Sequence, residues 1–174
     1  MSKHRISTTV VGSYPVPDWL RVYPNRQSLR DAIAVVIKGQ EDAGIDVVAD
    51  GELSRFDVNH PETNGMIDYF IGPMGGVSTQ VSREVLEAFR RDADMAYRAA
   101  PAGVVTGPLT EGMLNLPADA RLARSLTRSR LKFTVTGPHM LCKVLLDQHY
   151  GDHSALADAL ADALALQVAD VDAD

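Results

Sequence analysis

Two acidic side chains come directly after an apolar run in residues 47–52, VVADGE. Asp50 and Glu52 stand on either side of Gly51, where a buried strand is expected to end. Acids in this place can hold a positively charged group, or they can be solvated side chains of a turn. Gly12 and Ser13 end a second β-branched run, at residues 8–11, and add a hydroxyl to the candidate chemistry.

The elements around these residues determine whether they meet. A helix is predicted from Ser28, as its N-cap, to about Ala43, with Gly44 as the glycine after its end. Its buried face is predicted to hold Leu29, Ile33, Val36, Ile37 and Gln40. Strand, loop, helix and strand in this order indicate a right-handed βαβ unit. Because parallel strands place their carboxyl ends at one edge, Gly12-Ser13 and Asp50-Gly51-Glu52 are expected to face the same mouth.

A short repeat marks the second half of the chain. Residues 104–108 read VVTGP and residues 134–138 read TVTGP, and each is predicted to be a strand that ends at a tight turn. Helices are predicted at 82–99, between the two copies, at 139–147 and from Ser154 onward, with a long loop at 54–80. The fold class is therefore α/β, the first half of a TIM (β/α)₈ barrel, with parallel strands near 8–11, 45–49, 104–106 and 131–136. Residues 1–174 are expected to form a single partial barrel domain.

Composition excludes several classes of protein. The net charge is −6, and no basic stripe or polybasic run is present, which argues against nucleic acid and against anionic membrane surfaces. No apolar run approaches the roughly 20 residues of a membrane span. Cys142 is the single cysteine, which suits a reducing cytoplasm.

Histidine and cysteine give no metal motif by their spacing. His149 and His153 are four apart, but Gly151 interrupts any helix between them. Cys142 is expected in the core, and His139, three residues earlier, is not assigned as its partner in a site. No metal ligand is therefore predicted in this chain.

Three stretches together resemble a known family. TTVVGSYPVP, QEDAGIDVVADGELSR and FTVTGPHML, in this order, are similar to the catalytic barrel of cobalamin-independent methionine synthase. The resemblance covers nearly the whole chain but only the first half of the family's barrel. It implies methyl transfer from 5-methyltetrahydropteroyl-polyglutamate (a 5-methyltetrahydrofolate) to the zinc-bound thiol of homocysteine.

The resemblance also implies roles for individual residues. Ser13 and the backbone at Gly12 would hold the amino-acid substrate, Glu52 would pair with its ammonium group, and Asp50 would lie nearby. Thr136 and Gly137 would line the folate side of the mouth. His60, in the loop after the Asp-Gly-Glu turn, is a further candidate there.

The family's zinc ligands correspond to positions beyond residue 174. The resemblance therefore implies that this chain is truncated before the zinc-binding half, and that alone it is inactive. Its expected partners are a thiol amino acid and a second half of the barrel, unless two copies pair. Two alternatives stay open: a related zinc-dependent thiol alkyltransferase, for example with coenzyme M as the thiol, and a non-catalytic half-barrel fragment.

Overall fold

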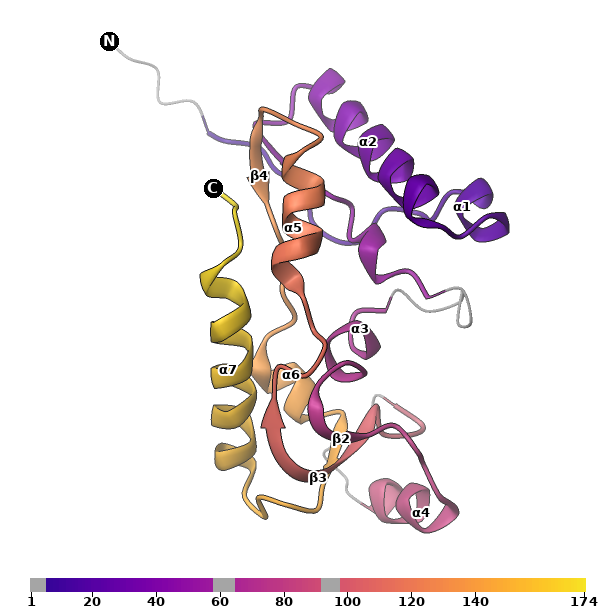
Figure 1. Cartoon of the computed structure of the whole chain (residues 1–174), viewed down its shortest axis with the longest axis vertical. Coiled ribbons are helices and arrows are strands. Elements are labelled where there is room, and N and C mark those ends of the chain that lie inside the picture. The colour runs from indigo at the N-terminus through magenta and orange to yellow at the C-terminus, as the bar shows by residue number, and fades with distance from the viewer. Residues whose placement is uncertain (1–5, 58–64, 92–97) are drawn as a thin grey trace. The chain divides into compact units, whose positions relative to one another are not determined.

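The computed structural model describes residues 6–57, 65–91 and 98–174 (Figure 1). Its contacts divide the chain into two compact units. Unit 1 comprises Met1–Asn64, Leu116–Thr134 and Val171–Asp174, and unit 2 comprises Gly65–Asn115 and Val135–Asp170. Each unit is described by itself below. His60 lies outside the described residues.

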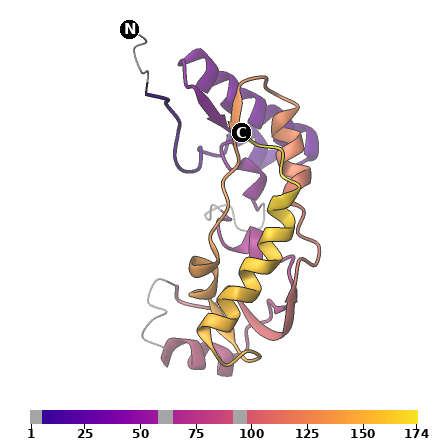
Figure 2. The ribbon, with the colours of Figure 1, turned by 90° about the vertical axis from the view of Figure 1, so that its left-hand side faces the viewer.

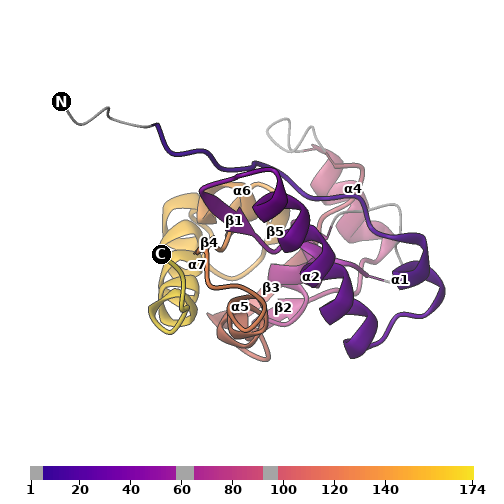
Figure 3. The ribbon, with the colours of Figure 1, turned by 90° about the horizontal axis from the view of Figure 1, so that it is seen from above.

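Unit 1 contains a pair of parallel strands with helices packed beside them. Its elements in chain order are α1 (Asp18–Val22), α2 (Arg26–Asp42), β1 (Val47–Ala49), the 3₁₀ turn η1 (Leu53–Arg55), α5 (Leu116–Arg124) and β4 (Arg130–Lys132). β1 and β4 pair in parallel, with Val48 opposite Leu131, and they lie side by side when seen from above (Figure 3). The expected strand at 8–11 is reduced to one parallel bridge between Thr9 and Val47. The expected strand at 131–136 ends at Lys132.

Helix α2 packs its apolar face against this strand pair. Its Ile33, Val36 and Ile37 are buried in one cluster with Val48 and Leu131. Because Val36 and Ile37 lie three and four positions after Ile33, on one face of the helix, the predicted helical spacing is confirmed. The N-cap differs from the prediction: it is Asn25, whose side chain accepts the backbone N–H groups of Gln27 and Ser28.

Unit 2 contains a separate three-stranded sheet. Its elements are α3 (Asp68–Ile71), β2 (Gly75–Ser78), α4 (Arg83–Arg91), β3 (Gly103–Thr110), α6 (Pro138–Cys142), β5 (Leu145–Asp147) and α7 (His153–Ala169). The strand order is β2-β3-β5, with β2 antiparallel and β5 parallel to β3. Helix α7 runs alongside α6 and β3, as Figure 2 shows from a second side. Residues 104–106 therefore lie in a strand, as predicted, but in a different sheet from β1.

The two Thr-Gly-Pro copies have different structures. The first does not end its strand, because β3 continues through Pro108 to Thr110. β5 pairs only with residues 103–105, so Pro108 lies where β3 has one neighbour and its missing N–H is tolerated. β2 has a register irregularity opposite this point, at Gly76, whose φ is 82°. The second copy ends as predicted, with Pro138 as the first residue of α6.

One predicted helix is wrong in its second part. Residues 139–147 were expected to be helical throughout, yet the helix ends at Cys142 and β5 follows at Leu145–Asp147. The apolar run there fits either element, and pairing with β3 decides the outcome. None of the helices within the described ranges is long and apolar enough to cross a membrane.

Candidate functional site

The turn at residues 50–52 has an unusual backbone. Gly51 has φ 73° and Glu52 has φ 58°, so two successive residues are left-handed, and Glu52 is the one non-glycine residue with positive φ among those described. The Asp50 carboxylate holds this turn, since its Oδ1 accepts the backbone N–H of Glu52 at 2.9 Å. The hydroxyl of Ser54 donates to Oδ2 at 3.4 Å. Asp50 therefore supports the turn from within.

The environment of Asp50 changes its proton affinity. The side chain is almost fully buried, and burial raises the pKa of the Asp50 carboxyl above its usual range. The bond from the Glu52 N–H and the Arg55 charge act in the opposite direction, while the Glu52 charge adds to the rise. Asp50 is thus a buried acid whose charged form is disfavoured.

Glu52 and Ser13 meet, as the shared-mouth prediction requires. The Ser13 hydroxyl donates to Glu52 Oε2 at 2.7 Å. The backbone N–H of Tyr14 donates to the carbonyl of Gly51 at 2.9 Å, which fixes the two segments against each other. The structure thus brings together Ser13, Asp50 and Glu52, three of the residues proposed to bind substrate.

Arg55 completes this cluster. Its Nη1 lies 3.1 Å from Glu52 Oε2, and its Nη2 donates to the carbonyl of Thr134, just after β4. Arg55 is 4% exposed and Glu52 is 9% exposed. Arg55 was not among the residues selected from the sequence, and the structure buries it with both arms of its guanidinium bonded. Its position three residues after Glu52 was the available sequence signal.

The two oxygens of Glu52 have different surroundings. Both Ser13 and Arg55 bind Oε2, and no hydrogen bond from the described part of the chain reaches Oε1. Oε1 is also absent from the fully enclosed polar atoms that lack a partner. An accessible, unused carboxylate oxygen on an otherwise buried side chain is an acceptor for a ligand.

The segment QEDAGID, residues 40–46, positions the turn. Buried Gln40 pairs with both the N–H and the carbonyl of Ala49, at 2.9 and 2.8 Å. Asp46 accepts the N–H and the hydroxyl of Thr8, at 2.8 and 2.9 Å. Gln40 thus binds α2 to the end of β1, and Asp46 binds the segment at Thr8 to the start of β1.

The same segment also reaches the chain before β4. Glu41 accepts the hydroxyls of Thr127 and Ser129, at 2.5 and 2.9 Å. These two bonds hold the pKa of the Glu41 carboxyl below its usual range. Lys132 in β4 donates in turn to the carbonyl of Val10, so the segment before Gly12 is bound from a second side.

Two of the residues predicted for the folate side, Thr136 and Gly137, lie in unit 2. The Thr136 hydroxyl donates to the carbonyl of Met66 at 2.7 Å, and Gly137 is the N-cap of α6. The Thr136 bond supports a loop, and Gly137 begins a helix. His60 lies outside the described residues, so its role stays a prediction.

The described residues do not fit a zinc site. No group of three or more His, Cys, Asp and Glu side chains comes together within the described ranges. Cys142 is buried, and its Sγ contacts the carbonyl of His153 at 3.5 Å. Burial, with a smaller effect from Asp147, raises the pKa of the Cys142 thiol, which disfavours the thiolate that binds zinc.

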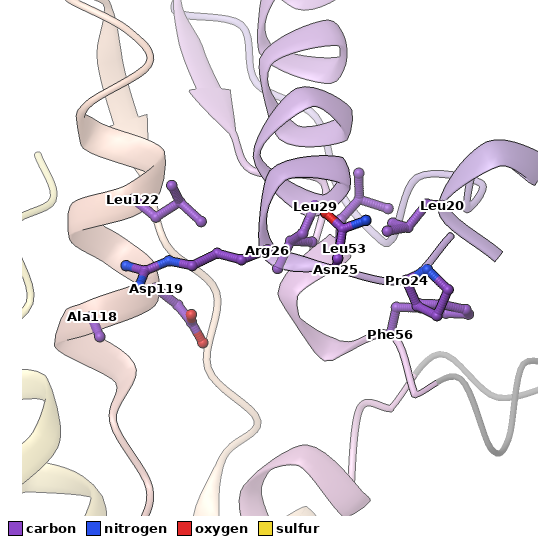
Figure 4. Close-up of a pocket in the computed structure, with 10 residues that line it drawn as sticks. All are labelled: Leu20, Pro24, Asn25, Arg26, Leu29, Leu53, Phe56, Ala118, Asp119 and Leu122. Carbon is purple, nitrogen blue, oxygen red and sulfur yellow. The ribbon is translucent and has the colours of Figure 1, made fainter. Parts of the chain in front are cut away.

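Unit 1 also has a pocket on its helical side, with a volume of about 500 Å³ (Figure 4). Apolar side chains make most of its wall, and Arg26 and Asp119 add charged groups. Its lining residues are Leu20, Pro24, Asn25, Arg26, Leu29, Leu53, Phe56, Ala118, Asp119 and Leu122. Ser13, Asp50 and Glu52 do not line it, so it is separate from the carboxylate cluster.

Comparison with known sequences gives a consistent family match. The family described as "Cobalamin-independent synthase, Catalytic domain" matches residues 6–174. Methionine synthase of Sulfolobus acidocaldarius is 29% identical over 169 residues, and that of Thermococcus kodakarensis is 28% identical over 168. Each alignment covers 90% of this chain and 45% of the relative. The chain thus spans about half the length of the curated relatives it matches.

Solved structures show the same partial coverage. A B12-independent methionine synthase from Shewanella sp. W3-18-1, in complex with selenomethionine, superposes with a TM-score of 0.72 at 24% identity. The match covers 94% of this chain and 47% of that one. A putative vitamin-B12-independent methionine synthase from Listeria monocytogenes gives a TM-score of 0.65 at 15% identity. The α/β fold expected from the sequence, matching about half of such catalytic structures, is confirmed.

Proposed function

Because this chain belongs to the family of cobalamin-independent synthase catalytic domains, we propose that it binds the amino-acid substrate of a methionine-synthase-like methyltransferase. The reaction proposed for the complete barrel moves a methyl group from 5-methyltetrahydropteroyl-polyglutamate to the thiol of homocysteine. The residues of this chain that would bind the amino acid are Ser13, Gly12 and Glu52, with Asp50 behind them.

The accessible Oε1 of Glu52 is the observation that supports this proposal most directly. It is an unused acceptor on a carboxylate whose other oxygen is held by Ser13 and Arg55. A ligand ammonium at Oε1 would form a charge-assisted hydrogen bond with a side chain that is only 9% exposed, and such bonds are stronger than neutral ones. A structurally similar protein was solved with selenomethionine, an amino acid that carries such an ammonium.

Asp50 would act through the turn. Its bond to the Glu52 N–H keeps the left-handed backbone that aims the Glu52 side chain. Ser13 would contribute by fixing Oε2, and the left-handed Gly12 before it shapes the backbone there, with φ 91°. The chain's own groups thus bind and orient the substrate.

The proposed reaction also needs a metal and a methyl donor. When bound, zinc keeps the substrate sulfur as a thiolate at neutral pH. Since the described residues do not fit such a site, we propose that the zinc ligands come from a second half of the barrel. Thr136, Gly137 and His60 remain our candidates for the folate side.

The cluster around Glu52 favours a thiol that is also an amino acid over a thiol without an ammonium group. Coenzyme M carries a sulfonate and no ammonium, so a carboxylate acceptor would repel it rather than bind it. A non-catalytic fragment would not need an accessible oxygen on Glu52. The discriminating property is therefore recognition of the ammonium.

Calorimetric titration of the chain with L-methionine tests the proposal. Replacing Glu52 by Gln removes the charge and is expected to weaken binding about 10- to 100-fold, or roughly 1.4 to 2.8 kcal/mol. Glu87→Gln is the matched control, because Glu87 is an exposed acid paired with Arg83. Equal affinities for the wild type and the Glu52 variant would overturn the proposal.

A further inference from the structure

We infer that Arg55 is a positioning residue that selects which oxygen of Glu52 faces the ligand. This inference rests on the proposed function, in which Oε1 receives the substrate ammonium. Arg55 itself does not contact the ligand in this scheme. It acts by occupying Oε2 from the inner side of unit 1.

The guanidinium contacts both Glu52 and the chain after β4. Nη1 lies 3.1 Å from Glu52 Oε2, and Nη2 donates to the Thr134 carbonyl. Thr134 follows β4, which pairs with β1, so Arg55 connects the chain beyond the ends of both strands. The backbone N–H of Arg55 also donates to the Glu52 carbonyl at 3.2 Å. Glu52 and Arg55 are thus linked through backbone and side chain together.

Only arginine can make this connection with its planar fork. Lysine carries one compact ammonium, which can hold the carboxylate or the carbonyl but lacks the fixed two-arm geometry. Without the guanidinium, Ser13 alone would hold Oε2, and the Glu52 side chain could rotate. The ammonium-binding oxygen would then lose its fixed place.

The Arg55 charge lies beside the ligand-binding carboxylate. Its Nη1 contacts Glu52 Oε2, which leaves Oε1 available for a ligand ammonium.

Comparing two ligands separates a positioning role of Arg55 from a general role in supporting the fold. L-methionine carries the ammonium, and 4-(methylthio)butanoate is the same molecule without it. Arg55→Met is expected to weaken methionine binding at least about 10-fold and to change binding of the des-amino compound less than about twofold. Arg55→Lys is expected to fall between the wild type and Arg55→Met. Equal losses for both ligands would mean a purely structural role and would overturn the inference.

Two further measurements separate this inference from the proposed function. If Glu52→Gln weakens methionine binding and Arg55→Met does not, the proposed function stands and the inference fails. Without any ligand, the carboxyl ¹³C signal of Glu52 is expected to show one ordered side chain in the wild type and rotamer averaging in Arg55→Met. An ordered Glu52 in the Arg55→Met and Arg55→Lys proteins would overturn the inference even if no amino acid binds. Arg83→Met, at an exposed ion pair, is the control.

Discussion

The side-chain amide of Gln40 completes the backbone hydrogen bonding of Ala49. Oε1 accepts the Ala49 N–H at 2.9 Å, and Nε2 donates to the Ala49 carbonyl at 2.8 Å. Gln40 thereby acts on β1 as a neighbouring strand would, one residue before Asp50. The carboxylate turn is therefore fixed to helix α2 as well as to its own strand.

Replacing Gln40 by Met should destabilise unit 1 by about 2–6 kcal/mol. Met has a similar size but leaves two buried backbone groups without partners, at about 1–3 kcal/mol each. Urea unfolding measures the loss. Gln27→Met is the control, because Gln27 is exposed and bonds to Asp31, and it should stay within about 0.5 kcal/mol of the wild type. A loss as small as that of the control would contradict this role of Gln40.

Gly51→Ala should destabilise the chain more than Gly44→Ala. Both glycines are left-handed, with φ 73° and 75°. A Cβ at Gly51 would lie 2.9 Å from Val36 Cγ1, whereas one at Gly44 would meet nothing within 4 Å. We expect about 1–2 kcal/mol for the backbone at either site and about 1–3 kcal/mol more for the contact at Gly51. Equal midpoints in thermal unfolding would show that the turn absorbs the contact.

Asp50→Asn should change how stability depends on pH. Since burial raises the pKa of Asp50 in the folded chain above the ordinary 3.8, the folded state binds the proton more tightly than the unfolded state. The contribution of Asp50 is therefore fully present below pH 3.8 and is lost as the pH rises through the folded-state pKa. The free energy of unfolding of the wild type, relative to Asp50→Asn, should fall over that window. A difference that grows with pH would contradict the assignment.

Glu41→Gln should show the opposite dependence. The hydroxyls of Thr127 and Ser129 lower the pKa of Glu41 from its ordinary 4.5, so the folded state releases the proton more readily. Its stabilisation is present above pH 4.5 and is lost as the pH falls through the folded-state pKa. The side chain is partly exposed, so we expect about 1 kcal/mol at neutral pH. Urea titrations of both proteins from neutral to acidic pH would detect this, and an undiminished difference at low pH would argue against it.

The chain alone should not hold zinc tightly. Cys142 is a buried thiol with a raised pKa, and the described residues form no ligand group. Elemental analysis after dialysis is expected to find far less than one zinc per chain, and Cys142→Ala should leave that amount unchanged. One tightly retained ion per chain would place the zinc site within these residues and refute our assignment of its ligands to a second half.

The sequence predicted the strand that carries the acids better than it predicted their surroundings. The helix before β1, the glycine that follows this helix and the apolar strand all follow local rules. They are confirmed, with shifts of up to three residues at their ends. The strands β2 and β5 were missed because both are short and depend on pairing with β3. The burial of Arg55 was missed because its partner Thr134 is 79 residues away.

The spacing of residues in the sequence could not predict how the side chains of the site are bonded. Glu52 was a candidate because it follows a strand, but the difference between its two oxygens arises from Ser13 and Arg55 on separate segments. Gln40 was placed on the buried face of a helix, and its bonds to Ala49 required the strand to be in position. The local sequence pattern thus identified the candidate residues, whereas tertiary contacts determine how their side chains are oriented.

The discontinuity of unit 1 sets an order of events during protein synthesis. Ser13 and Glu52 leave the ribosome early and can meet at once, but Thr134 is made 79 residues after Arg55. Residues 65–115, which belong to unit 2, emerge in between. At about 5–20 residues per second, this delay is roughly 4–16 seconds. For that interval the Arg55 guanidinium lacks its bond to Thr134, so the nascent chain carries the acidic turn before the fixed orientation of Glu52 can form.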